Sequence, residues 1–342
     1  MMGERMRERR LSILVAIGCL LVAAGLSGAS GTATGDPAAA DPATAELVFT
    51  DRAGQRQQIM HVYSPSMARV ITLHVITAFD TSEPRPTLYL LNGAGGGEDR
   101  ANWHRQTDIV QFLADKNVNV VTPIGGAFSY YTDWYADDPE IGRHRWTTFL
   151  TRELPPVIDT ALGTNGVNAV AGVSMSATSA LNLAIAAPDL YRAVASYSGC
   201  ASTSDAISRT YIELVLARAD ADVRNMWGEP GDPAWLRHDA VLNADKLRGK
   251  TIYISSATGL PGREDTLANP LVGGEPTTLA NQIVLGGMIE AATNLCTHRL
   301  AGRLAELGIP ATVEFQPAGT HSWMYWQDAF HRSWPILEAA LR

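Results

Sequence analysis

Residues 169–186 read AVAGVSMSATSALNLAIA and place Ser174 at the junction of two patterns. The apolar residues before it predict a short buried strand, and the small apolar residues from 177 to 187 predict a helix. A serine at a sharp strand-to-helix turn, with small neighbours, is the arrangement called a nucleophile elbow. The usual pattern is G-x-S-x-G, and here Gly172 keeps the first glycine while Ser176 replaces the second. The junction therefore predicts that Ser174 is a nucleophile.

A serine hydroxyl needs a neighbouring base to remove its proton before it can attack. Among the eight histidines, His321 lies just after the last predicted strand, in the stretch PAGTHSW, and precedes a predicted helix. This position fits the chain order nucleophile, acid, histidine of α/β-hydrolases. His321 is therefore the predicted base, whereas His298 is interpreted as a surface or packing residue.

The spacing of the residues does not decide which carboxylate would orient this histidine. Glu264 and Asp265 follow the predicted strand 252–257, where many hydrolases carry their acid. Glu290 lies near the start of a predicted helix over 287–307, after two glycines. Either position could place a carboxylate on the second nitrogen of the imidazole and hold its tautomer.

The loop NGAGGG, residues 92–97, follows the predicted strand 86–91. It does not match the phosphate-binding pattern G-x-G-x-x-G, because Glu98 stands at the third glycine position. Its place after the third strand instead predicts an oxyanion hole, built from a backbone N–H near Ala94 and that of Met175. No metal-ligand spacing occurs, so neither a metal nor a cofactor is expected.

The elements that must position these groups alternate along the chain. A β region over 47–78 is followed by alternating strands and helices up to the C-terminus, and no linker or internal repeat interrupts residues 46–342. Strands that alternate with helices predict an α/β class fold, namely an α/β-hydrolase fold with a mostly parallel central sheet and helices on both faces. In such a sheet the catalytic groups lie at the carboxyl ends of the strands. The predicted strands are 86–91, 118–123, 166–171, 191–199, 250–257 and 311–315, and the predicted helices are 108–116, 147–162, 177–187, 287–307 and 323–341.

The N-terminus has the features of an export signal. Four arginines precede an apolar run over 11–26, and the small residues Ser-Gly-Ala follow at 27–29. This predicts a signal peptide over residues 1–29, with cleavage between 29 and 34, and the alternative is an uncleaved membrane anchor. Residues 30–45 are rich in Ala, Pro and Asp and predict a flexible linker.

The net charge of the chain excludes some classes of binding partner. Residues 1–29 contain four Arg and two Glu, so their removal takes the net charge from −8 to −10. A chain this acidic is not expected to bind nucleic acid or an anionic membrane as its main partner.

Of the three cysteines, Cys19 would leave with the signal, and Cys200 and Cys296 would pair in an oxidising compartment. The alternative is two buried free thiols.

Six stretches resemble the secreted mycolyltransferases, that is, the antigen 85 family and its corynomycolyltransferase relatives. They occur in the same order over roughly residues 85–335, which is nearly the whole predicted catalytic domain. The stretches are LYLLNG (88–93), YTDWY (131–135), WTTFLTRELP (146–155), GVSMS (172–176), MWGEPGDPAW (226–235) and GTHSWMYW (319–326).

The resemblance implies roles for individual residues. It implies Ser174 as nucleophile, His321 as base and Glu290 as acid, which makes Asp265 the second choice. It further implies that the amides of Ala94 and Met175 form the oxyanion hole. The residues expected to border the sugar pocket are Asn92, Gly93, Trp103, Ser322 and Trp323. The cysteine pair resembles the corynomycolyl branch.

Two positions depart from the antigen 85 pattern. That family has an Asp and an Arg where this chain has Asn92 and Gly95. Charge-assisted contacts to a sugar would be lost here, so the resemblance leaves open how trehalose is held and whether it is the preferred sugar.

The activity implied is transfer of a mycolyl or corynomycolyl group from trehalose monomycolate, through a serine ester. The acceptor would be a second trehalose monomycolate or cell-wall arabinogalactan. The expected location is the cell wall or outer envelope of a mycolic-acid bacterium, with peripheral envelope association.

Residues 207–223 would form a mobile apolar cover or, alternatively, a plain core helix. Two other functions remain open: a secreted carboxylesterase of the same fold and a non-catalytic cell-wall binding protein.

Overall fold

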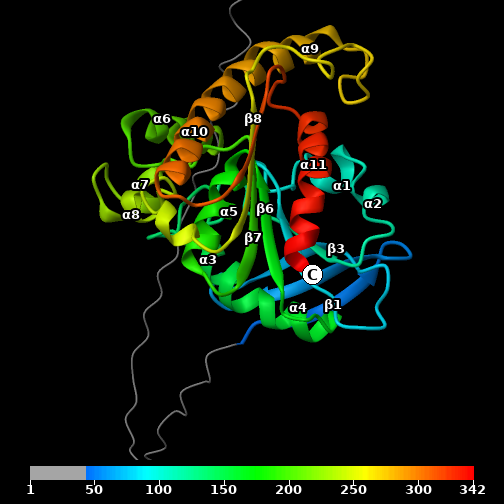
Figure 1. Ribbon diagram of the computed structural model, residues 1–342. Helices are drawn as coiled ribbons and strands as arrows, with labels where there is room; N and C mark the ends of the chain where they lie inside the picture. The colour runs from blue at the N-terminus through cyan, green and yellow to red at the C-terminus, as the bar shows by residue number, and fades with distance from the viewer. Residues whose placement is uncertain (1–43) are drawn as a thin grey trace, which may run out of the picture. The chain divides into compact units, whose positions relative to one another are not determined.

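The strands form where the sequence has short runs of β-branched and apolar residues. The computed structural model describes residues 44–342, and within them nine strands make one sheet in the order β1-β2-β3-β5-β4-β6-β7-β8-β9 (Figure 1). The strands are β1 (Glu46–Arg52), β2 (Gln57–Ser64), β3 (Arg69–Ile76), β4 (Thr87–Leu91), β5 (Asn119–Ile124), β6 (Asn168–Val173), β7 (Tyr191–Tyr197), β8 (Thr251–Ala257) and β9 (Thr312–Gln316).

The sheet is antiparallel at one end and parallel through the rest. Strands β1, β2 and β3 pair antiparallel, and β3 pairs antiparallel with β5. From β5 through β4, β6, β7 and β8 to β9 every pair is parallel. This confirms the predicted mostly parallel sheet of the α/β-hydrolase fold, and it brings the carboxyl ends of β4, β6, β7 and β8 to one edge.

Helices connect the strands and cover the sheet. They are α1 (Trp103–Gln106), α2 (Ile109–Phe112), α3 (Trp146–Thr148), the π-helix η1 (Phe149–Glu153), α4 (Leu154–Leu162), α5 (Met175–Ala186), α6 (Ala206–Leu216), the 3₁₀-helix η2 (Ala217–Ala219), α7 (Val223–Trp227), α8 (Pro233–Arg237), the 3₁₀-helix η3 (Ala244–Leu247), α9 (Pro276–Asn281), the π-helix η4 (Gln282–Gly286), α10 (Gly287–Glu306) and α11 (Trp323–Leu341).

Two helices differ from the prediction. The helix expected over 108–116 is only the one-turn helix α2, because the Ala114 and Lys116 N–H groups bond to carbonyls three residues before them and turn the chain out of the helix. The separate one-turn helix α1 lies before the predicted range, and Asn102 caps it. The helix expected from residue 287 begins earlier, at Pro276, and continues through the π-helix η4. Proline is favoured in a first helical turn, and the glycine pair at 286–287 does not interrupt the helix.

The alternation of side chains along the strands gives the sheet two apolar faces. One face packs under α4, α5, α6 and α10, where Tyr89 and Val170 belong to the larger core. The other face packs under α1, α2 and α11, where Leu88 and Ala171 belong to the second core. Helices therefore cover both faces, as predicted, and the described residues 44–342 lie in one compact unit.

Two of the predicted segments lie wholly or largely outside the residues that the structure describes, and a third lies within them. The signal peptide over 1–29 and nearly all of the linker over 30–45 fall outside the described residues. Within residues 44–342 no helix is long and apolar enough to cross a membrane. The segment 207–223 contains α6, whose Ile212 and Leu216 are buried in the core while Ile207 and Leu214 are about half exposed. It has features of both a core helix and an exposed apolar surface.

Candidate active site

Ser174 lies at the turn between β6 and α5. Its backbone has φ 57° and ψ −121°, a conformation that residues other than glycine rarely adopt. The turn is tight because a Cβ on Gly172 would lie 2.2 Å from the carbonyl oxygen of Ser176. The Ser174 N–H donates to the Tyr197 carbonyl of β7 (2.9 Å), which ties the turn to the sheet. This is the geometry of a nucleophile elbow.

The His321 ring lies between Ser174 and Glu290. His321 Nε2 is 2.8 Å from Ser174 Oγ, and His321 Nδ1 is 2.8 Å from Glu290 Oε2. The Nδ1–H can therefore donate to the carboxylate while Nε2 accepts the serine proton. The backbone holds the ring in place, since the His321 N–H donates to the Gly286 carbonyl at the end of η4 (3.2 Å).

Glu290 is in the first turn of α10 and is 1% exposed. Its Oε1 accepts hydrogen bonds from the Ser198 hydroxyl (2.8 Å) and from the Ala257 N–H at the end of β8 (2.7 Å). These donors leave Oε2 directed at His321. Ser198 was not predicted as a site residue; its only signal in the sequence is its place at the carboxyl end of a predicted strand.

The alternative acid, Asp265, is close to the base but bonds to other groups. Its carboxylate accepts from the Thr320 hydroxyl (2.6 Å) and the Tyr325 phenol (2.7 Å). His321 Nδ1 is already engaged by Glu290. Among the alternatives that the spacing left open, the geometry therefore favours Glu290 as the partner of the base.

The two residues predicted to form the oxyanion hole belong to segments next to Ser174. A Cβ on Gly93 would be 3.8 Å from Ser174 Cβ, so the loop carrying Ala94 passes beside the serine. The Ala94 carbonyl accepts from the Phe128 N–H (2.7 Å), which fixes the orientation of this loop. Met175 is the first residue of α5, where a helix leaves its N–H groups without intrahelical partners.

The residues expected to border a sugar pocket divide into two groups. Asn92 and Trp103 are fully buried: Asn92 bonds to the Pro123 carbonyl and the Trp103 N–H, and the Trp103 indole donates to the Leu91 carbonyl. The core encloses both side chains, and their hydrogen bonds support the loop that follows β4.

The other three are close to the reacting groups. Gly93 is adjacent to Ser174, and Ser322 and Trp323 directly follow His321. The Trp323 ring is partly exposed and packs edge-on against Trp103, with ring centroids 5.5 Å apart. Gly93 is itself buried, whereas Ser322 and Trp323 are half-buried, and a sugar contact by these three stays a prediction.

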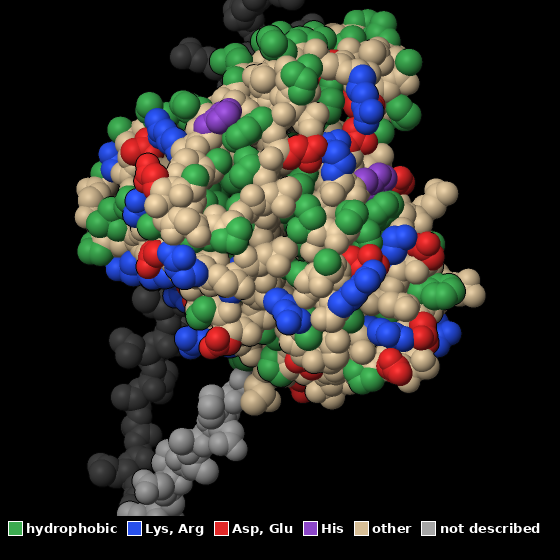
Figure 2. All heavy atoms as spheres, viewed as in Figure 1, with side chains coloured by type: hydrophobic (Ala, Val, Ile, Leu, Met, Phe, Trp, Pro, Cys, Tyr) green, Lys and Arg blue, Asp and Glu red, His purple; other side chains and the backbone are tan. Residues whose placement is uncertain are grey.

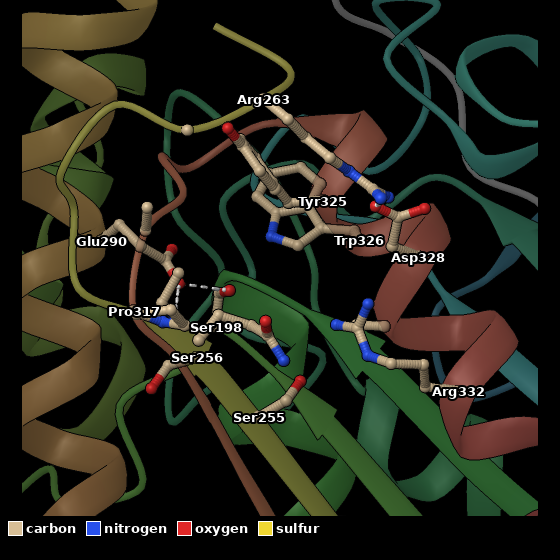
Figure 3. A pocket seen from close by; sticks show the side chains of 15 residues that line it. Ser198, Ser255, Ser256, Arg263, Glu290, Pro317, Tyr325, Trp326, Asp328 and Arg332 are labelled. Carbon is tan, nitrogen blue, oxygen red and sulfur yellow. Dashed lines mark hydrogen bonds and ion pairs between the residues drawn. The ribbon is translucent and has the colours of Figure 1, made fainter.

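A cleft of about 260 Å³ lies behind the acid (Figure 3). Glu290 and Ser198 line it together with Tyr325, Trp326 and Arg332, whereas Ser174 and His321 do not. The cleft is therefore adjacent to the triad and is not the place where Ser174 would attack a substrate. Within residues 44–342 no group of three or more His, Cys, Asp or Glu residues is arranged to hold a metal ion.

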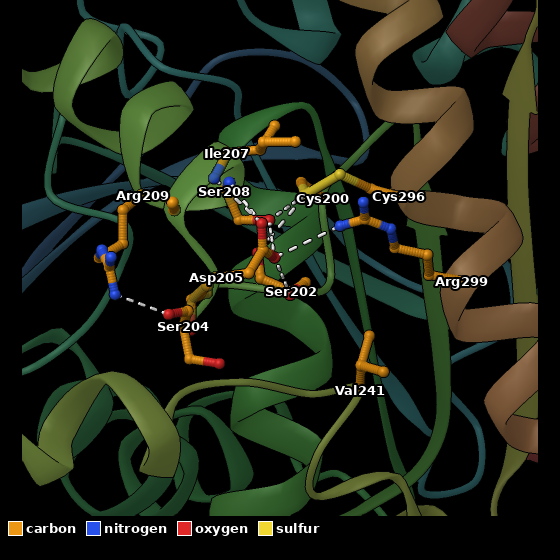
Figure 4. A network of polar contacts seen from close by, with 12 residues as sticks. Cys200, Ser202, Ser204, Asp205, Ile207, Ser208, Arg209, Val241, Cys296 and Arg299 are labelled. Atoms are coloured by element: carbon orange, nitrogen blue, oxygen red, sulfur yellow. Dashed lines mark hydrogen bonds and ion pairs between the residues drawn. A yellow bond between two sulfur atoms is a disulfide. The ribbon is translucent and has the colours of Figure 1, made fainter. Parts of the chain in front are cut away.

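The predicted disulfide between Cys200 and Cys296 is confirmed. It joins the loop after β7 to α10, two turns beyond Glu290. The same loop is held by Asp205, the N-cap of α6, which accepts from Ser202 and Ser208 and lies 3.4 Å from an Arg299 nitrogen (Figure 4). Burial raises the pKa of Asp205, but these hydrogen bonds and the Arg299 charge outweigh it and lower the pKa to about 2.

Comparison with known proteins agrees with this geometry. The model of the family described as putative esterase matches residues 64–335. The diacylglycerol acyltransferase/mycolyltransferase Ag85A of Mycobacterium leprae is 32% identical over 299 residues, which cover 85% of each chain. Its counterpart in Mycobacterium tuberculosis strain H37Rv is 31% identical over 342 residues, which cover 98% of this chain and 92% of that protein.

Solved structures share the fold. The crystal structure of MPT51 from Mycobacterium tuberculosis aligns with a TM-score of 0.69 at 24% identity, over 84% of this chain and all of that one. An S-formylglutathione hydrolase from Agrobacterium tumefaciens aligns with a TM-score of 0.56 at 15% identity, over 86% of this chain and 99% of that one. The chain therefore belongs to the putative esterase family and, within it, to the group of the Ag85 diacylglycerol acyltransferase/mycolyltransferases.

Proposed function

We propose that this protein is a serine-dependent acyltransferase that moves a mycolyl or corynomycolyl group from trehalose monomycolate to a second sugar hydroxyl. The observation that carries the proposal is the hydrogen-bonded series Ser174, His321, Glu290 in a chain of the Ag85 family. A serine, an imidazole and a carboxylate in this series can form and break an ester without a cofactor.

In the first half-reaction the Ser174 oxygen attacks the ester carbonyl carbon of the donor. His321 Nε2 accepts the serine proton, and Glu290 stabilises the imidazolium that forms. The amides of Ala94 and Met175 donate to the oxyanion of the tetrahedral intermediate. When the intermediate collapses, the bond to the sugar oxygen breaks and the imidazolium returns the proton to it. Trehalose leaves, and the acyl group remains esterified to Ser174.

The second half-reaction repeats these steps with a new alcohol. An acceptor hydroxyl gives its proton to His321 Nε2 and attacks the acyl carbon, and the Ser174 ester bond breaks with return of the proton to the serine. Water competes for the same position. An acceptor at about 1 mM against roughly 55 M water needs a preference of about 5 × 10⁴, or ~6 kcal/mol, to share the product equally.

An apolar surface near the acid supports a lipid substrate. Val284, Leu285, Met288 and Ile289 lie in the segment that leads into Glu290, and each is 38–69% exposed. Figure 2 shows apolar side chains gathered over the end of the molecule formed by α9 and the loop before it. Between Glu275 and Arg299 the only acidic or basic residue besides His298 is the buried Glu290. An uncharged apolar surface of this kind suits a long acyl chain.

The finer parts of the proposal concern location and acceptor. The predicted signal peptide over 1–29 would export the chain, and we place it in the cell wall or outer envelope of a mycolic-acid bacterium. There a second trehalose monomycolate or arabinogalactan would accept the acyl group. The replacement of two charged positions of the antigen 85 pattern by Asn92 and Gly95 makes sugar preference the feature in which this chain departs from that group.

The test is incubation of the full mature chain with trehalose monocorynomycolate, with and without added trehalose or arabinogalactan fragments. Mass spectrometry of the protein is expected to find the acyl group on Ser174, and the sugar products are expected to include the acylated acceptor. Free acid as the sole product at every acceptor concentration would support a carboxylesterase instead. A folded protein that takes up no acyl group and is not labelled by a fluorophosphonate would support a binding protein.

A further inference from the structure

Asp265 is a buried carboxylate that the triad does not use. It lies in the loop between β8 and α9 and is 8% exposed. No salt bridge pairs it with a cation among residues 44–342. Its neighbour Arg263 pairs with Asp328 (Figure 3) and with Glu264. A buried carboxylate without a counter-ion is costly unless hydrogen bonds satisfy its oxygens.

Four donors from four segments satisfy this carboxylate. Oδ1 accepts from the Thr320 hydroxyl (2.6 Å) and from Gln282 Nε2 (2.8 Å). Oδ2 accepts from the Gly262 N–H (2.8 Å) and from the Tyr325 phenol (2.7 Å). Burial raises the pKa of Asp265, but these four hydrogen bonds outweigh it and lower the pKa below its ordinary value. The group is therefore ionised at neutral pH.

The segments joined at Asp265 are those that hold the base. Thr320 directly precedes His321. Gln282 begins η4, whose last residue, Gly286, accepts the His321 N–H through its carbonyl. Tyr325 is in the first turn of α11, four residues after His321. The carboxylate thus connects to the loop before the imidazole, the π-helix beside it and the helix after it.

We propose that Asp265 is a positioning residue for His321: it holds the histidine loop, through Thr320 and Tyr325, in the place where Nε2 meets Ser174. The inference rests on the proposed acyl transfer at Ser174 and concerns the same site. A displacement of the imidazole by about 1 Å lowers a reaction rate by up to about 100-fold. The test ester described below carries no sugar, so a shift of Ser322 and Trp323 does not enter its KM, and the loss of Asp265 acts on kcat and leaves KM nearly unchanged.

Four variants, two at Thr320 and one each at Asp265 and Asp138, separate this role from general support of the fold. Thr320→Val removes one hydrogen bond to Asp265 and keeps the size of the side chain, whereas Thr320→Ser keeps the hydroxyl. Asp138→Asn is the matched control for Asp265→Asn, because Asp138, in the loop between β5 and α3, is also buried (3% exposed) and accepts from the Glu140 N–H, the Asp222 N–H and Asn225 Nδ2.

The experiment measures hydrolysis of a short p-nitrophenyl ester and the rate of fluorophosphonate labelling of Ser174, in variants matched by melting temperature. We expect Asp265→Asn and Thr320→Val to lower kcat and the labelling rate by about 10- to 100-fold, with KM within about twofold, and Thr320→Ser to restore the wild-type rate. Equal losses in Asp138→Asn, an unchanged kcat in Thr320→Val, or no restoration by Thr320→Ser would overturn the inference. Ester hydrolysis and labelling do not depend on mycolyl transfer. If the proposed function fails, the wild-type protein is still labelled at Ser174 but does not transfer the acyl group, so the two failures are distinguishable.

Discussion

At the scale of single residues, the site combines a strained backbone with a fully bonded carboxylate. Ser174 has a positive φ, and so does Ser198, whose hydroxyl holds Glu290. Positive φ in residues other than glycine costs of order 1–3 kcal/mol and persists where the surroundings enforce it. Here the strained serines stand at the carboxyl ends of β6 and β7, and the strain directs one hydroxyl to the base and the other to the acid.

Removal of the nucleophile is expected to abolish the chemistry and leave the fold intact. Ser174→Ala should lose fluorophosphonate labelling and acyl uptake, because no other hydroxyl lies within hydrogen-bond distance of His321 Nε2 among the described residues. Glu290→Gln should lower the labelling rate by about 10³- to 10⁴-fold, since the imidazole would take the wrong tautomer. Labelling followed by peptide mass spectrometry checks both.

A buried serine remote from the elbow provides the control. Ser333, on α11, bonds to the Tyr197 phenol and to the Phe330 carbonyl. Ser333→Ala should keep the labelling rate within about twofold of the wild type. Full turnover by Ser174→Ala would contradict the assignment of the nucleophile.

At the scale of elements, the close approach of β6 to α5 makes one glycine indispensable. A Cβ on Gly172 would lie 2.2 Å from the Ser176 carbonyl oxygen, and neither backbone can move without displacing Ser174. Gly172→Ala is therefore expected to destabilise the protein by about 1–3 kcal/mol and to reduce labelling of Ser174. Thermal unfolding and labelling rates measure the two effects.

Another glycine, on α10, provides a control, because alanine is expected to stabilise the protein there. Gly302 is exposed in the interior of this helix, and a Cβ there would meet nothing within 4 Å. Gly302→Ala should stabilise the protein by about 0.5–1 kcal/mol, because alanine loses less backbone entropy in a helix. Equal shifts of the melting temperature in the two variants would contradict the steric argument at Gly172.

The disulfide acts between elements, since it joins the loop after β7 to α10 across 96 residues of sequence. Closing a loop of this length restricts the unfolded chain and stabilises the fold by about 2–5 kcal/mol. The double variant Cys200→Ser, Cys296→Ser should unfold at a correspondingly lower urea concentration. The wild type with dithiothreitol should unfold at the same urea concentration as the variant, and dithiothreitol should not shift the unfolding of the variant. A shift in the variant would show that the reductant acts on something other than this disulfide.

At the scale of the whole molecule, buried histidines make stability depend on pH. Burial, and next the positive charge of Arg69, lower the pKa of His144 from 6.5 to about 4. The imidazole is 2% exposed and its Nδ1 accepts from the Trp146 indole (3.1 Å), so the neutral form is the one that fits. Because the unfolded chain binds a proton at higher pH than the folded chain does, the stability is complete above about pH 6.5 and decreases as the pH falls to about 4.

Replacement of this histidine should flatten the pH profile. His144→Asn can still accept from the indole but has no proton to gain. The urea-unfolding free energy of the wild type should fall between pH 7 and pH 4 by up to about 3 kcal/mol more than that of the variant, since each pKa unit corresponds to ~1.4 kcal/mol. Parallel profiles for the two proteins would show that His144 does not titrate in this range.

Much of the fold could be predicted from the sequence because its signals are local. The strand before Ser174, the small residues after it and the glycines beside it lie within a few positions of one another, and periodicity and turn chemistry act over that distance. The alternation of strands and helices then predicted a parallel sheet, and the order serine, acid, histidine pointed to His321. The shortening of the helix expected over 108–116 to α2 and the early start at Pro276 escaped prediction, because tight turns after Phe112 and a tolerated glycine pair decided them.

The sequence by itself determined the family and predicted the type of chemistry, with Ser174 as the nucleophile. The spacing left Glu290 and Asp265 open and the family resemblance pointed to Glu290, but only the tertiary structure shows that Glu290 bonds to His321, that Ser198 supports it, and that Asn92 and Trp103 are enclosed by the core. The physical reason is distance along the chain. Ser174 and His321 are 147 residues apart, and the contacts between them depend on how β7, α10 and α11 pack, which no spacing within a single segment encodes.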